Sequence, residues 1–179
     1  MNILIINGSA REQSNSFGIS KVIETNLKQS GIDTELFDLR KEELPIFKME
    51  EQQYANVSVN KLVNLSQKAD AFFIVTPEYH NGISGALKNC LDFLGIDHFK
   101  KKPVAIAAAQ GGVVGGFNAL NQLRLILRSL HANVLTEQLI INARNFDDKQ
   151  VIFDETSVQQ IEGLVAELIQ ETGIRLQHS

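Results

Sequence analysis

Apolar residues gather in short runs that alternate along the chain with segments of helical spacing. The unbroken runs are Ile3–Ile6, Phe72–Val75, Val104–Ala109 and Leu139–Ile141, and a weaker, alternating run covers Thr34–Asp38. Unbroken apolarity is typical of strands that are buried on both faces, as a parallel sheet requires. The pattern therefore predicts a five-stranded parallel sheet.

The segments between these runs carry apolar residues at the spacing of amphipathic helices. They predict one helix over 19–27, ended by Gly31, and another over 86–94, with Ser84 as N-cap and Gly95 as the stop. Further helices are predicted over 120–130 and 157–172. The stretch from Leu39 to Gln53 lacks this spacing and is interpreted as a surface loop that could contact a partner.

Strands and helices alternate along the chain, which predicts a right-handed, doubly wound α/β sheet with helices on both faces. The length of 179 residues suits one domain, taken as residues 1–179. In such a sheet, ligands bind beyond the carboxyl ends of the strands. Loops 7–16, 76–83 and 110–117 all leave strands at that edge. We therefore expect these three loops to build one ligand site.

The amino-acid composition narrows the classes of partner that this protein could bind and indicates where in the cell it is expected. A net charge of −4 and a pI near 5.6 argue against a general nucleic-acid or anionic-membrane binder. No export signal is visible and no apolar run approaches the ~20 residues of a membrane span, so a cytoplasmic location is expected. Cys90 is the only cysteine, which excludes an internal disulfide and a cysteine-based metal cluster, and it is interpreted as a core residue.

The first loop has the composition of a phosphate-binding turn. Ser9, Ser14 and Ser16 offer hydroxyl groups, Arg11 offers a permanent cation, and the start of a helix exposes backbone N–H groups. The spacing matches neither the P-loop nor the dinucleotide fingerprint. It favours a monophosphate seat, and the alternative is a set of N-capping serines beside a solvated arginine.

The second loop has the composition of a platform for a flat ring. Pro77 restrains the backbone, so that Tyr79 can lie near a planar heterocycle and Asn81 can offer donors and acceptors to it. His80 is interpreted as a hydrogen-bonding residue, with proton transfer as an alternative, because neither a nucleophile nor a metal-ligand set accompanies it. Glu78 is expected to fix the loop by hydrogen bonding.

The third loop begins with Gln110 and Gly111 and carries four glycines. Gln110 could donate a hydrogen bond to the oxygen edge of a ring, and the glycines, Gly111 among them, would let the backbone approach a ligand closely. A mobile turn without a ligand is the alternative.

Together the three loops resemble the NADPH-dependent FMN reductase family, whose members include azobenzene, quinone and chromate reductases with a flavodoxin-like fold. The likeness rests on the segments IINGSAR, TPEYHNGISGALKNCLDFL and KPVAIAAAQGGVVGGFNALNQLRLILRSL, and it covers nearly the whole chain. The family pattern of Gly-Ser-x-Arg followed by Ser-x-Asn holds the FMN phosphate. In this chain Ser14, Asn15 and Ser16 occupy the second part of that pattern. The Pro-Glu-Tyr-Asn ring platform of the family corresponds to Pro77–His80, with His80 in place of Asn.

This resemblance implies a ping-pong cycle in which hydride passes from NADPH or NADH through bound FMN to an oxidised acceptor. The acceptor would be an azo compound, a quinone, a metal oxyanion or a flavin. Because the flavin carries the chemistry, no catalytic side chain and no metal are expected. The resemblance also implies a homodimer or homotetramer with the flavin near a subunit interface.

Three alternatives remain at this point. A flavodoxin-type electron carrier would keep FMN without the reductase activity, although such carriers are usually more acidic than this chain. An FMN-based redox sensor would keep the cofactor without catalysis. A phosphorylatable receiver module has a similar strand order, but it needs paired acids where this chain has Asn7-Gly8-Ser9.

Overall fold

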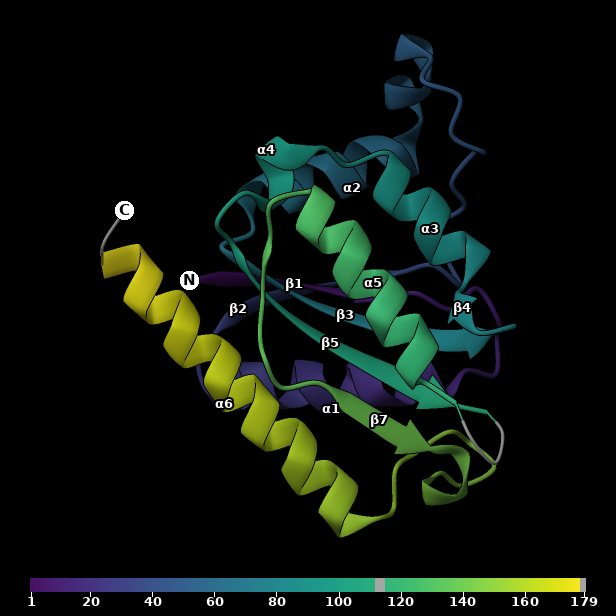
Figure 1. The fold of residues 1–179 in the computed structure, drawn as a ribbon, viewed down its shortest axis with the longest axis vertical. Coiled ribbons are helices and arrows are strands. Elements are labelled where there is room, and N and C mark those ends of the chain that lie inside the picture. The colour runs from purple at the N-terminus through teal and green to yellow at the C-terminus, as the bar shows by residue number, and fades with distance from the viewer. Residues whose placement is uncertain (112–114, 178–179) are drawn as a thin grey trace.

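The computed structural model describes residues 1–111 and 115–177. A parallel sheet with the strand order β2-β1-β3-β5-β6 forms its centre (Figure 1). The strands are β1 (Asn2–Asn7), β2 (Asp33–Asp38), β3 (Ala71–Tyr79), β4 (Gly82–Ile83), β5 (Pro103–Gln110), β6 (Asn133–Val134) and β7 (Leu139–Asn142). β6 pairs with the start of β5 and β7 pairs with its end, so these two short strands share the fifth position. The small strand β4 forms an antiparallel hairpin with β3.

All five predicted strands are present, and the doubly wound, flavodoxin-like fold is confirmed. β5 is buried along its whole length, whereas the edge strand β2 alternates between exposed and partly buried positions before its buried end. This difference explains why the runs of the inner strands are unbroken and that of β2 is not. β3 is longer than predicted, because it continues beyond Val75 through Pro77 to Tyr79.

Helices cover both faces of the sheet (Figure 1). They are α1 (Asn15–Gln29), α2 (Val57–Lys68), α3 (Gly85–Asp92), α4 (Ile96–Phe99), α5 (Phe117–Ser129) and α6 (Glu155–Gln177), with short 3-10 turns η1 (Glu51–Ala55) and η2 (Ala143–Asn145). α1 and α6 pack on one face, and α2, α3 and α5 pack on the other. Within the described ranges, no helix has both the length and the apolarity to cross a lipid bilayer.

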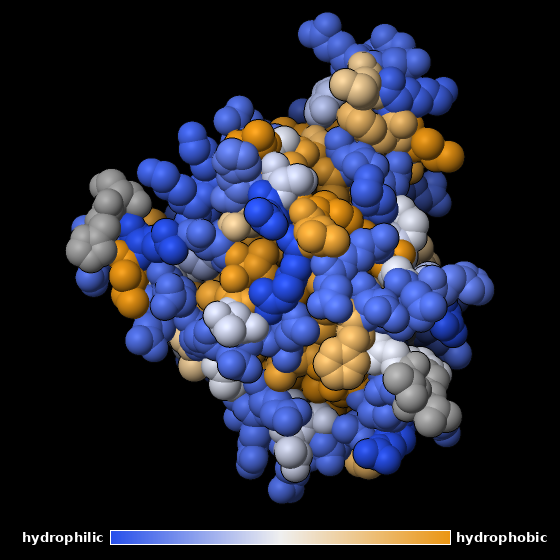
Figure 2. All heavy atoms as spheres, viewed as in Figure 1, coloured by the Kyte–Doolittle hydropathy of each residue, from blue (hydrophilic) through white to orange (hydrophobic). Residues whose placement is uncertain are grey.

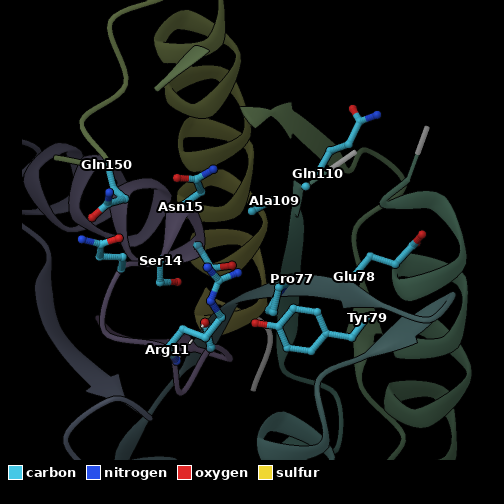
Figure 3. A pocket seen from close by; sticks show the side chains of 13 residues that line it. Arg11, Ser14, Asn15, Pro77, Glu78, Tyr79, Ala109, Gln110 and Gln150 are labelled. Atoms are coloured by element: carbon cyan, nitrogen blue, oxygen red, sulfur yellow. Dashed lines mark hydrogen bonds between the residues drawn. The ribbon is translucent and has the colours of Figure 1, made fainter. Parts of the chain in front are cut away.

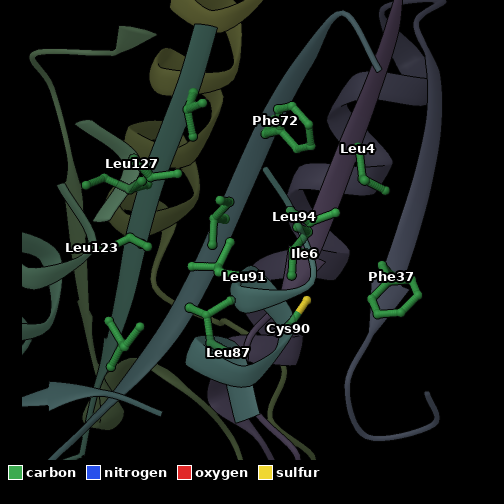
Figure 4. Close-up of a cluster of buried hydrophobic side chains, with 14 of the residues drawn as sticks. Leu4, Ile6, Phe37, Phe72, Leu87, Cys90, Leu91, Leu94, Leu123 and Leu127 are labelled. Atoms are coloured by element: carbon green, nitrogen blue, oxygen red, sulfur yellow. The ribbon is translucent and has the colours of Figure 1, made fainter. Parts of the chain in front are cut away.

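Successive side chains of each inner strand enter opposite cores. Figure 4 shows Leu4, Ile6 and Phe72 of the sheet against side chains of α3 and α5. On the other face, Ile3 and Ile5 meet the apolar stripes of α1 and α6. Cys90 is fully buried in the first of these cores, and burial raises the pKa of its thiol. The interpretation of Cys90 as a core residue is confirmed.

The predicted helix ends were right at α1 and wrong at α3. Gly31 follows α1 with a φ of 70°, and the N–H of Ile32 reaches the carbonyl of Leu27, as in a Schellman cap. Ser84 caps α3 as predicted, but the helix ends at Asp92, and Gly95 is instead the N-cap of α4. The N–H groups of Phe93 and Leu94 bond to the carbonyls of Cys90 and Leu91, three residues back, so the end of the helix tightens into a 3-10 turn.

α2 was missed by the sequence analysis. Only Val59, Leu62 and Ser66 of its 12 residues are buried, so its apolar stripe is thin. Its N-cap is Asn56, whose side chain accepts hydrogen bonds from the N–H groups of Ser58 and Val59. Before it, the predicted loop 39–53 is irregular over residues 39–50, but its end, residues 51–53, belongs to η1.

Candidate functional site

An open groove lies at the carboxyl ends of β1, β3 and β5 (Figure 3). The three predicted loops all reach it. The sequence-predicted site residues that line it are Ser9, Arg11, Ser14, Asn15, Ser16, Pro77, Glu78, Tyr79, Gln110 and Gly111, and the lining is completed by Gln13, Ala109 and Gln150. His80 and Asn81 are not among the lining residues. The groove opens between β1 and β3, where the strand order of the sheet changes direction.

Gly8 holds the first loop against β3. Its N–H donates to the carbonyl of Val75 at 2.7 Å, and a Cβ atom on Gly8 would also lie 2.7 Å from that oxygen. Any side chain there would separate the two backbones. The Ser84 hydroxyl donates to the Gly8 carbonyl from the other side. The close approach of β1 and β3 thus sets where the first loop leaves the sheet.

The first loop gathers groups that favour an anion. Ser14 is the N-cap of α1, and its Oγ accepts from the Phe17 N–H at 3.3 Å. The N–H groups of Asn15 and Ser16 are then the first-turn donors that remain at the groove. Ser16 Oγ is buried and has no hydrogen-bond partner among the described residues. Arg11 is exposed and forms no ion pair with any residue that the structure describes.

The second loop forms the opposite wall. Pro77 continues β3 beside Ala109 of β5. The backbone nitrogen of Pro77 points toward β1, on the same side as the backbone groups of Val75. Val75 pairs with Asn7, the last residue of β1. Because β1 ends there, the missing N–H of Pro77 costs the sheet no hydrogen bond. Figure 3 shows the Tyr79 hydroxyl directed across the groove toward Arg11. The wall therefore presents a proline, an aromatic ring and the small Ala109.

Glu78 ties the second loop to the third. Its carboxylate accepts a hydrogen bond from the Ala119 N–H in the first turn of α5 at 2.9 Å. The N-cap of α5 is Gly116, which has no side chain to offer, so Glu78 takes over the capping. A carboxylate also suits the positive end of the helix dipole. The expectation that Glu78 fixes the loop by hydrogen bonding agrees with this contact.

We expect Glu78→Ala to lower the free energy of unfolding by about 1 kcal/mol, the usual cost of removing a helix cap. Chemical denaturation would measure the loss, and Glu137→Ala, at an exposed glutamate outside the groove, is the matched control. Equal stability of the two variants would show that the contact with Ala119 contributes nothing.

His80 and Asn81 form the tip of the β3–β4 hairpin. Their φ angles are 50° and 63°, and Tyr79 pairs with Gly82, which is the pattern of a two-residue type I′ turn. Both side chains are exposed, and the Asn81 carboxamide oxygen accepts from Asn118 at 3.3 Å. Turn formation thus accounts for these two residues, and the structure does not bring them to the groove.

Gln110 ends β5 at the edge of the groove. Its carboxamide oxygen accepts from Asn142 Nδ2 of β7 at 3.0 Å, which leaves its NH₂ group as the end available to a ligand. Gly111 also lines the groove, whereas the rest of the glycine-rich prediction falls partly on 112–114, which lie outside the described residues.

Three lining residues were missed by the sequence analysis. Gln13 lies within the first loop and Ala109 precedes Gln110, so both stand beside predicted residues. Gln150 comes from a turn after β7 and has a φ of 59°. Asp147 organises this turn by accepting from the N–H groups of Lys149 and Val151. The polar run 147–150 could have indicated a turn, but nothing local indicates that it folds against α1.

Comparisons with known proteins agree with this arrangement. Residues 1–145 match the family described as NADPH-dependent FMN reductase. This chain belongs to the NADPH-dependent FMN reductase family. It is 39% identical over 151 residues to the NADPH azoreductase of Bacillus sp. (strain OY1-2), covering 84% of this chain and 82% of that protein. It is 36% identical over 152 residues to the FMN-dependent NADPH-azoreductase of Staphylococcus saprophyticus, covering 82% and 79%.

Among solved structures, the fold is similar to FerB, a flavoenzyme NAD(P)H:(acceptor) oxidoreductase from Paracoccus denitrificans. The TM-score is 0.79 with 23% identity, and the match covers 96% of this chain and 97% of that one. A flavodoxin from the domain Archaea matches with a TM-score of 0.68 and 14% identity, over 97% and 99% of the two chains. Family membership confirms the expected resemblance and, at the level of the family, the expected FMN and NADPH dependence.

Proposed function

We propose that residues 1–179 form one FMN-binding domain that uses NAD(P)H to reduce a small oxidised acceptor, with azo compounds as the first class to test. The observation that carries the proposal is the groove itself. Three loops meet there, with anion-binding groups along the first loop and a proline and an aromatic ring on the second. The relatives that are named azoreductases support the choice of acceptor.

The residues of the groove fit the cofactor. A buried hydroxyl without a partner is costly, and Ser16 Oγ is such a group. A phosphate seated at the start of α1 would accept from it and from the N–H groups of Asn15 and Ser16. Ser9 is 1% exposed, and Arg11, which has no ion-pair partner in the described part of the chain, adds a positive charge at the rim. We assign Ser9, Arg11, Ser14, Asn15 and Ser16 to the phosphate.

We assign Pro77, Glu78, Tyr79, Gln110 and Gly111 to the ring end of the site. Pro77 and the Tyr79 side chain offer surfaces against which a planar heterocycle can lie. The Gln110 NH₂ group can donate to an oxygen at the edge of the ring, because its carboxamide oxygen is already held by Asn142. Bound FMN would supply hydride transfer from NAD(P)H to the acceptor. The side chains position the ring and leave one side of the groove open to solvent.

We also propose that the protein acts as a homodimer or homotetramer in the cytoplasm. Apolar side chains are exposed on α5 and on the segment before α2, where Leu125 is 66%, Phe117 63%, Ile46 77% and Met49 84% exposed. Figure 2 shows apolar surface over α5 and on the projecting segment at the upper right. A subunit contact would cover these groups. Light scattering coupled to size exclusion would measure the mass, and a mass near the chain's 19.9 kDa would contradict the assembly.

The visible spectrum of the purified protein tests the main proposal. We expect a yellow protein, or one that becomes yellow with added FMN, and we expect anaerobic NADPH to bleach the flavin band. A subsequent addition of an azo dye should restore the band as the dye loses its colour. These two half-reactions are separable because each has its own optical signal.

Two results would contradict the proposal in different ways. A colourless protein that does not retain added FMN would remove the cofactor assignment. A yellow protein that NADPH does not bleach would point instead to an electron carrier or a redox sensor. A protein that is bleached by NADPH but not reoxidised by azo dyes would keep the reductase and change the acceptor, with quinones as the next class.

A further inference from the structure

Arg40, just after β2, makes a dense set of contacts beneath the first loop. Its Nε and one terminal nitrogen hold the carboxylate of Asp38 in a fork, at 3.0 and 2.7 Å. The other terminal nitrogen donates to the backbone carbonyl of Glu12 at 3.1 Å. The guanidinium also lies over the ring of Phe17, 3.3 Å from its centre. Arg40 thus joins the end of β2 to both sides of the Ser14 N-cap.

Asp38 extends this set of contacts to the root of the loop. Its Oδ1 accepts from Asn7 Nδ2 at 2.7 Å, and the same Asn7 nitrogen donates to the Ser9 carbonyl at 3.3 Å. The Ser9 N–H donates back to Asn7 Oδ1 at 3.4 Å. The contacts therefore run from Arg40 through Asp38 and Asn7 to Ser9, and separately from Arg40 to Glu12 and Phe17. They hold the first loop at both of its ends.

The pair is well shielded from water. The side chains of Arg40 and Asp38 are 16% and 9% exposed. Burial alone would raise the pKa of Asp38, but hydrogen bonds from Arg40 and Asn7 outweigh it and hold that pKa below its usual value. The Asp38 carboxylate is therefore ionised at neutral pH, and its charge balances that of the guanidinium. Arg40 does not line the groove, so its charge is directed to Asp38 and not to a ligand.

We propose that Arg40 is a positioning residue that sets the geometry of the phosphate-binding loop, and so the affinity for the phosphate of FMN, without touching the cofactor. The proposal rests on the proposed FMN site. A phosphate seat depends on several donors standing at fixed places, and a loop that must be ordered on binding loses affinity. Arginine suits the task because its planar fork binds a carboxylate, a carbonyl and an aromatic face at once. Lysine, a point charge, cannot do this.

Binding of FMN and of riboflavin, which lacks the phosphate, tests the proposal. Arg40→Met should weaken FMN binding by about tenfold and change riboflavin binding much less. This loss is at the lower end of the range seen when a residue that supports a binding group, without touching the ligand, is removed. Arg40→Lys should not restore the affinity. The double variant Asp38→Asn/Arg40→Met removes both charges of the pair. Its preference for FMN over riboflavin should still be smaller than that of the natural protein. Such a loss of preference in a neutral variant is caused by loop geometry and not by electrostatics.

Salt dependence gives a second readout. Because Arg40 does not contact the phosphate, the charge-balanced double variant Asp38→Asn/Arg40→Met should leave the slope of log Kd against log salt unchanged, whereas loss of a direct phosphate ligand would flatten it. Should Arg40→Met fail to fold by circular dichroism, Phe17→Leu removes the ring beneath the guanidinium and keeps the ion pair. It should shift the ratio of the two affinities in the same direction.

An equal loss of FMN and riboflavin affinity would overturn the proposal, since it would reflect general destabilisation. So would full rescue by lysine, or an Arg40→Met protein with unchanged FMN affinity. If the natural protein binds neither flavin, the proposed function fails instead, and the role of Arg40 in FMN binding falls with it.

Discussion

Replacing Arg11 by alanine should weaken FMN binding by about tenfold or more, because a hydrogen bond to a charged group contributes about 1.5–3 kcal/mol. Arg11 lines the groove, is exposed, and has no anionic partner among residues 1–111 and 115–177. A dianion seated at the start of α1 would be its natural partner. Its exposure places the effect at the lower end of this range, since water and salt screen the charge.

Fluorescence titration with FMN at several salt concentrations measures this effect. The difference between the natural protein and Arg11→Ala should narrow as salt rises, since screening weakens only the contact that the natural protein has. Arg128→Ala is the matched control, because Arg128 is an exposed arginine in the last turn of α5 and does not line the groove. An FMN dissociation constant that is the same in all three proteins would mean that Arg11 is merely solvated.

Gly18→Ala should destabilise the protein and weaken FMN binding together. A Cβ atom on Gly18 would lie 2.1 Å from the backbone carbonyl of Gln150 and 3.1 Å from the ring of Phe146. The turn that carries Gln150 must then move away from α1, and overpacking of this kind costs about 1–3 kcal/mol. Since Gln150 lines the groove, its displacement changes one wall of the proposed phosphate seat.

Gly163→Ala is the matched control for this substitution. Gly163 lies inside α6, and a Cβ atom there meets nothing within 4 Å. Alanine is the better helix former, so this variant should gain about 0.5–1 kcal/mol. Denaturant unfolding of the apoprotein and FMN titration of the folded protein separate the two effects. A Gly18→Ala protein that is as stable as Gly163→Ala would show that the turn does not pack on α1 as the structure describes.

Local sequence patterns predicted the structure correctly where residues within a single helix or strand decide it. The inner strands, the N-cap Ser84 and the stop at Gly31 all depend on residues a few positions apart. The three loops also follow from local signals, because the carboxyl ends of parallel strands must share one edge. α2 was missed because a thinly buried helix leaves only a weak apolar stripe.

Long-range contacts account for what the sequence analysis missed in the site. Gln150 reaches the groove because Gly18 leaves room for its carbonyl, although the two residues lie far apart in the sequence. Arg40 reaches the first loop through Asp38 and through the carbonyl of Glu12. Strand pairing also sets the place of His80 and Asn81. The pairing of Tyr79 with Gly82 makes them the tip of a tight hairpin turn, and their contact with a cofactor stays a prediction.

Residue pattern alone is enough to predict the class of fold, the edge of the sheet that carries the groove and most of the residues that line it. Short-range spacing and strand order are sufficient for these, because they depend on which residues avoid water and on how parallel strands connect. Packing between distant segments sets which polar side chains face the groove, which ones hold the loops from behind, and that Glu78 caps α5. Those outcomes depend on the distances between segments far apart in the chain, and no local pattern encodes such distances.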